Sequence, residues 1–185
     1  MSAMRARGIA SAVAAAGVIG TAAALAGCSA EVAPGAAALD PDGGVVVTVD
    51  QVDSVSAELS EAFPGTADVE RLVVFFSVIS DDVRDLAGES GTVVSADEAR
   101  RGVAEQTELQ LSDEAAQVIA TSTMFAQLAQ GPRGEVLVER VAGLEPVVNP
   151  RYGTWDAARW EPGQGVPIGE ESLPWVSREG AEPTG

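Results

Sequence analysis

The chain has 185 residues and a net charge of −17, with 28 acidic residues against 11 basic ones. It contains no histidine and one cysteine, and every basic residue is an arginine. These absences exclude Ser-His-Asp and Cys-His catalysis, lysine Schiff bases and zinc sites built from His and Cys, and the negative charge argues against nucleic acid as a partner.

The N-terminus has the pattern of a secretory signal. Residues 1–7 carry two arginines and no acid, and residues 8–27 contain no charged residue. A basic segment followed by an apolar segment that ends in small residues is typical of a signal peptide. The alternative is an uncleaved membrane helix, because about 20 apolar residues would just span a bilayer.

The end of the apolar run favours a cleaved signal. It reads Leu25, Ala26, Gly27 and Cys28, and this sequence resembles the bacterial lipobox, in which the cysteine sulfur takes a diacylglycerol and the signal is cut before the cysteine. We therefore expect residues 1–27 to be removed and Cys28 to hold the protein on the outer face of the cell membrane by its acyl chains. Two or three chains anchor stably, since each buried methylene contributes roughly 0.8 kcal/mol.

The mature chain, residues 28–185, would carry nine arginines and 28 acids, a net charge of −19. Its first part, residues 28–44, is rich in small residues with Pro and Gly, which predicts a flexible tether. The β-branched run at 45–49 predicts a short strand.

Helical periodicity starts after this strand. Apolar residues recur at helical spacing over 50–63, where Pro64 follows, and then form one long stripe over 69–86. We expect one helix in each of these two segments.

Two further helices follow. Ser95 with Glu98 three residues later is a capping-box pattern that opens the third helix. The fourth runs from near Ser112 to Gly131. A short amphipathic stretch leads to an extended segment at 145–148, which is the best partner for the first strand.

The predicted fold class is therefore mainly α, with four to five helices and a two-stranded pairing of the 45–49 segment with the 146–149 segment. The predicted domain covers residues 45–156. Residues 157–185 have Pro, Gly and acids and no sustained period, which predicts a loosely ordered acidic tail.

Three side chains are candidates for an apolar groove: Phe76, Met124 and Phe125. A place in the core is the favoured interpretation for Met124 and Phe125, and the alternative is that an exposed Met and Phe line a groove for apolar segments. No cofactor and no metal site are expected.

A second candidate cluster is Arg151, Tyr152 and Trp155 in the closing segment "VNPRYGTWD". Arg151 can pair with a carboxylate, and Tyr152 can pack with its hydroxyl reaching a partner. These residues form either a structural clasp that seals the strand onto the helices or a recognition site.

The order of elements, with "TVDQVD", "VVSADEARRGVAE" and "VNPRYGTWD", resembles the SurA N-terminal-type domain found in lipoproteins of GC-rich Gram-positive bacteria. The resemblance covers about residues 45–156. It implies a helical domain, similar in fold to the C-terminal chaperone region of trigger factor, that holds non-native segments in apolar grooves. The peptidyl-prolyl isomerase module of the related foldases is missing, so isomerase activity is not expected.

The predicted function is a lipid-anchored, chaperone-like binding module or assembly factor, not an enzyme, whose partners are exported or unfolded polypeptides. The alternative is an envelope scaffold or regulatory lipoprotein that binds one folded envelope protein through Trp155, Trp160 and Trp175, because tryptophans often anchor interfaces. A third hypothesis, ranked last, is a hydrolase that uses the carboxylates of Asp81, Asp82 and Asp85, although a solvated helix face is the more common explanation of such a cluster.

Overall fold

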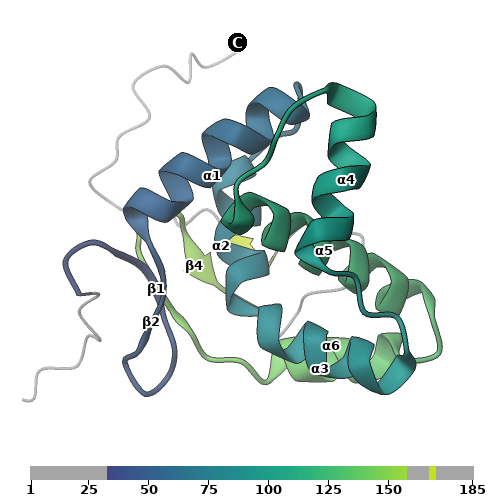
Figure 1. Ribbon diagram of the computed structural model, residues 1–185. Coiled ribbons are helices and arrows are strands. Elements are labelled where there is room, and N and C mark those ends of the chain that lie inside the picture. The colour runs from purple at the N-terminus through teal and green to yellow at the C-terminus, as the bar shows by residue number, and fades with distance from the viewer. Residues whose placement is uncertain (1–32, 158–166, 170–185) are drawn as a thin grey trace, which may run out of the picture.

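The computed structural model describes residues 33–157 and 167–169 (Figure 1). The described residues form six helices and five short strands, which confirms the mainly α fold class. The helices are α1 (Val49–Ala62), α2 (Val69–Val78), α3 (Ser80–Ser90), α4 (Ala96–Thr107), α5 (Asp113–Gln130) and α6 (Gly134–Ala142). The strands are β1 (Ala36–Leu39), β2 (Val45–Thr48), β3 (Val147–Val148), β4 (Thr154–Trp155) and β5 (Ile168–Gly169). None of the helices in the described part of the chain is both long and apolar enough to cross a membrane.

The main sheet is antiparallel, with strand order β2-β1-β3. Ala38 of β1 lies opposite Val47 on one side and Val148 on the other. The predicted direct pairing of 45–49 with 146–149 is therefore wrong, because β1 lies between these two strands. The prediction of a tether over 28–44 is wrong from Ala36 onward for the same reason. Alanines have low strand propensity, so the run Ala36–Leu39 carries no strand signal in the sequence although all four of its residues are buried.

A tight turn joins β1 to β2. The Asp40 carboxylate accepts a hydrogen bond from the Gly44 amide at 2.7 Å, and the Gly43 amide donates to the Asp40 carbonyl at 3.0 Å. Gly43 has a φ of 88°, a backbone conformation that glycine adopts without a steric cost. The turn folds the hairpin that places β2 at the edge of the sheet. Figure 1 shows this hairpin at one side of the molecule, away from α4.

Capping boxes define the starts of two helices. Ser95 and Glu98 form the predicted box at the start of α4. Thr48 and Gln51 form a second one at the start of α1, so β2 passes directly into α1 with both orphan amides satisfied.

The long helix predicted over 69–86 is wrong, because it is broken at Ile79 into α2 and α3. Ile79 has φ −88° and ψ 1°, outside the helical region, and its side chain is fully buried. Two residues earlier, the Ser77 hydroxyl donates to the Val73 carbonyl at 2.8 Å, a contact that often bends helices. The apolar stripe continues through the break, so periodicity does not reveal it.

Helix α5 is the centre of the fold, because it contacts α1, α2, α3, α4 and α6. Its buried side chains include the small residues Ala115, Ala116, Ala120 and Thr121, all 0% exposed. Small side chains let neighbouring helices approach closely, so the first half of α5 lies near both α1 and α2.

The last described residues extend the domain beyond the predicted boundary. Strand β5 pairs with β4, and the Asp156 amide donates to the Pro167 carbonyl at 2.7 Å. Ala157 and Ile168 are buried in the core. The predicted loosely ordered tail over 157–185 is therefore wrong for Ala157 and for 167–169, and its other residues lie outside the described ones.

Candidate functional site

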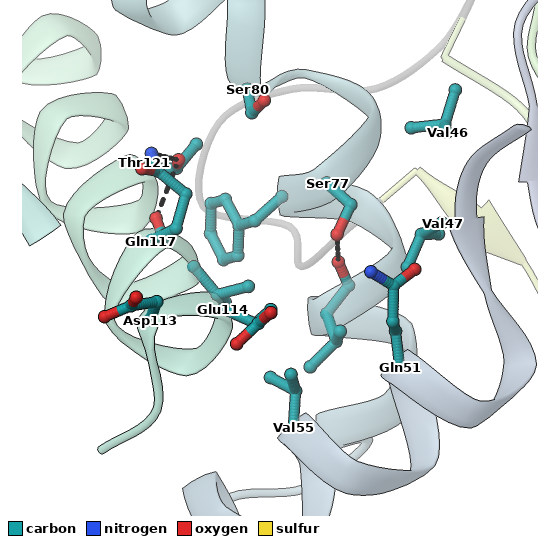
Figure 2. A pocket seen from close by; sticks show the side chains of 13 residues that line it. Val46, Val47, Gln51, Val55, Ser77, Ser80, Asp113, Glu114, Gln117 and Thr121 are labelled. Atoms are coloured by element: carbon teal, nitrogen blue, oxygen red, sulfur yellow. Dashed lines mark hydrogen bonds between the residues drawn. The ribbon is translucent and has the colours of Figure 1, made fainter. Parts of the chain in front are cut away.

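An apolar groove of about 340 Å³ lies between the hairpin and the helices, and we call it the β2 groove (Figure 2). Its apolar lining comes from β2, α1, α2 and α5 and consists of Val46, Val47, Val55, Val73, Phe76 and Val118. Segments that are far apart in the sequence build it, so no single motif could predict it.

The local structure of the chain fixes the strand side of the groove. The Thr48 amide donates to the Gln51 side-chain oxygen at 3.0 Å, and the Gln51 amide donates to the Thr48 hydroxyl at 3.2 Å. These bonds hold Gln51, at the groove margin, in one orientation next to Val46 and Val47.

Two of the three hydroxyls that line the groove are occupied by their own helices. Ser77 donates to the Val73 carbonyl, and Thr121 donates to the Gln117 carbonyl at 2.9 Å (Figure 2). These groups therefore need no ligand, and what the groove offers a ligand is mainly apolar contact.

The first turn of α5 adds two carboxylates to the groove margin. Asp113 pairs with Arg100 of α4, whereas Glu114 is exposed and makes no ion pair with another described residue. Both acids suit the positive end of the helix dipole, which explains their place structurally. Because Arg100 offsets the charge of Asp113, Glu114 carries the remaining negative charge of this margin of the groove.

Of the three predicted groove residues, only Phe76 lines the β2 groove. Met124 is 1% exposed and belongs to the core, so its prediction as a groove residue is wrong. Phe125 is half-buried and packs edge-on against Phe75 and Phe76, with ring centroids 5.6 and 5.9 Å apart. Its place is in an aromatic cluster behind the groove.

Asn149 ties the closing segment to the central strand. Its backbone N–H donates to the Ala37 carbonyl at 2.9 Å, and its side-chain nitrogen donates to the Ala36 carbonyl at 3.0 Å. Its side-chain oxygen accepts from the Arg151 amide at 3.0 Å. Sequence reasoning used Asn149 only as the residue before a proline and missed this role.

Arg151 joins the closing segment to two helices. Its guanidinium lies 2.7 Å from the Asp53 carboxylate in α1 and 3.4 Å from the Glu70 carboxylate in α2. The hydrogen bond with Asp53 raises the pKa of Arg151, so the side chain stays charged. This geometry matches the clasp interpretation.

The Arg151 guanidinium lies over the ring of Tyr152, with its Cζ atom 5.2 Å from the ring centroid. Tyr152 itself is 2% exposed. Burial raises the pKa of its hydroxyl. Its hydroxyl and that of Ser56 make no hydrogen bond among the described residues, and both residues line a polar cleft of about 640 Å³ between α1 and α2.

Trp155 stacks on Phe75, with ring centroids 5.9 Å apart and planes at 29°. Its indole N–H has no hydrogen-bond partner among the described residues. Trp155 therefore packs the β4–β5 pair onto α2 and completes the clasp.

Two of the three carboxylates considered for a hydrolase are held in separate ion pairs. Asp81 lies 3.0 Å from Arg84 on the same helix, and Asp82 lies 3.7 Å from Arg140 of α6. In the described residues, no group of three or more acidic, His or Cys side chains is arranged to hold a metal ion.

The lipobox residues Leu25, Ala26, Gly27 and Cys28 lie outside the described residues, as do Trp160 and Trp175. Comparison of the chain with protein families, with curated proteins and with solved structures finds no match.

Proposed function

We propose that this protein is a lipid-anchored module on the outer face of the cell membrane that binds apolar segments of exported or unfolded polypeptides, with chaperone or assembly-factor character and without enzymatic activity. The observation that carries this proposal is the β2 groove, an apolar hollow beside an edge strand. The resemblance of the sequence to the SurA N-terminal-type domain supports the same class of function.

The size and chemistry of the groove support weak and general binding. Its volume of about 340 Å³ is near the lower end for a ligand site, so it accommodates a few side chains of a longer chain. The hydroxyls of Ser77 and Thr121 are occupied by backbone carbonyls, so the groove offers few polar groups to select one ligand. A high negative charge of the mature chain would keep copies of the protein apart.

The proposed anchor would hold the domain close to the bilayer. Seven residues separate Cys28 from the start of β1 at Ala36. A segment of this length reaches at most about 30 Å. Exported chains would then meet the groove near the membrane surface.

The alternative, one folded partner bound through the tryptophans, has less support. Trp155 packs against Phe75, so its ring face is used within the domain. Its remaining candidates, Trp160 and Trp175, lie outside the described residues.

The test uses residues 28–185 with Cys28→Ser in an aggregation-suppression assay on two unrelated unfolding proteins. Val46→Asp puts a charge into the half-buried lining of the groove, and Gln117→Trp fills the groove without a charge. Val93→Asp is the matched control, because Val93 is 55% exposed and does not line the groove. Circular dichroism checks that each variant is folded.

Suppression of both aggregating proteins that is lost in the two groove variants and kept in Val93→Asp supports the proposal. No suppression by the parent chain, or equal suppression by all variants, contradicts it.

A further inference from the structure

Strand β2 has a hydrogen-bonding partner on one side only. The sheet order β2-β1-β3 places it at an edge, and no described strand pairs with its outer side. Edge strands present unpaired backbone groups to other chains. Val45, at its start, is a large apolar residue that is 55% exposed.

The β2 groove borders β2, an edge strand of the sheet. Val46 and Val47 are consecutive and both line the groove. The groove therefore follows the strand over two successive residues. Figure 2 shows the two valines together at one side of the groove, across from Asp113 and Gln117 of α5.

The register of the hairpin leaves one residue of this edge unpaired. Val45 lies opposite Leu39 and Val47 lies opposite Ala38, so Val46 has no partner residue on β1. Val46 is thus the extra residue of a β-bulge, next to the groove.

The charge at the opposite margin selects the occupant. Glu114 is exposed without an ion pair among the described residues, Asp113 lies beside it, and the mature chain as a whole would carry a net charge of −19. A basic side chain would be favoured at this margin, and an acidic one would be repelled.

We propose that the groove binds an extended polypeptide segment with alternating apolar and basic residues, which adds to the free edge of β2 as a further strand. This inference rests on the proposed function and names its binding mode. Backbone hydrogen bonds to β2 would hold the segment whatever its sequence, while alternate side chains enter the groove and a basic side chain reaches Glu114.

The first test separates backbone pairing from side-chain contact. A ten-residue peptide of alternating Val and Arg is titrated into residues 28–185 carrying Cys28→Ser, and binding is measured by fluorescence anisotropy. Two further peptides carry N-methyl groups on one or the other alternate set of amides. N-methylation removes the donor and keeps the side chains, so one methylated peptide should lose at least tenfold in affinity while the other binds like the parent.

The outcomes distinguish the two proposals. If the parent peptide does not bind, the proposed function fails as well. If it binds and both methylated peptides bind as tightly as the parent, the segment is held by its side chains alone. If both lose affinity equally, it binds as a helix. In either case strand addition is wrong while the groove remains a binding site.

The second test examines the charge. Glu114→Gln should weaken binding of the Arg-containing peptide several-fold and reduce its dependence on salt. Glu105→Gln is the control, because Glu105 is an exposed acid on α4 that does not line the groove. Equal effects of the two substitutions, or equally tight binding of a Val and Glu peptide, would overturn the proposed preference for basic segments.

Discussion

At the residue scale, two polar residues of the closing segment, Asn149 and Arg151, differ in how much they stabilise the fold. Asn149 makes two side-chain hydrogen bonds, one to β1 and one to the turn that holds Arg151. Arg151 makes ion pairs with Asp53 and Glu70 in which each side chain is about half exposed. Exposed ion pairs contribute little to stability because water screens them and the side chains lose entropy.

We therefore expect Asn149→Ala to lower the free energy of unfolding by about 1–2 kcal/mol and Arg151→Ala to lower it by less. Urea unfolding of both variants at low salt measures the difference. A larger loss of unfolding free energy for Arg151→Ala would mean that the ion pairs of Arg151, and not the side-chain amide of Asn149, hold the closing segment.

The capping box of α4 makes a residue-scale prediction on pH. Backbone and side-chain hydrogen bonds from Ser95 lower the pKa of Glu98 below the ordinary value for a glutamate. A lowered pKa in the folded state adds stability above the unfolded pKa, and this stability is lost as pH falls through the folded pKa.

Glu98→Gln keeps a capping side chain and removes the titration. The fall in unfolding free energy between pH 7 and pH 3 should therefore be smaller in Glu98→Gln than in the parent chain. Glu105→Gln serves as control, and an unchanged fall in Glu98→Gln would show that Glu98 adds nothing to the acid sensitivity.

At the element scale, the sequence predicts the helices better than the strands. Capping residues and apolar spacing predict where α1, α4 and α5 begin, because these signals are local. The break at Ile79 cannot be predicted from periodicity, because α2 and α3 bury one continuous apolar stripe. Strand β1 could not be predicted because three of its four residues are alanines, and it pairs with β3, more than a hundred residues away.

The central position of β1 is testable. Ala37 is 0% exposed, so Ala37→Leu should overpack the core and lower the free energy of unfolding by about 1–3 kcal/mol. Ala126→Leu is the matched control at an exposed position of α5, where a change of about 0.5 kcal/mol or less is expected. Equal effects in urea unfolding would restore the interpretation of residues 28–44 as a tether.

At the scale of the whole molecule, distant segments close the domain and form its groove. Ile168 is 3% exposed and belongs to the same core as Val47 and Leu137. Periodicity could not predict this, because an isolated two-residue strand has no period. The β2 groove escaped prediction for a related reason, since five elements each contribute one to five residues to it.

We expect Ile168→Ala to destabilise the domain by about 2–4 kcal/mol, the range for large-to-small changes in a core. Thermal and urea unfolding should agree on this loss. A stability equal to that of the parent chain would show that β5 is not part of the folded core.

The groove is the central claim, and site-specific photo-crosslinking tests it most directly. A photoreactive amino acid replaces Gln117, which lines the groove, or Gln106, which is exposed on α4 outside it. Each protein is irradiated with a purified unfolded polypeptide. Crosslinks from position 117 that greatly exceed those from position 106 are the expected result, and equal yields from the two positions, or none from 117, would contradict the account.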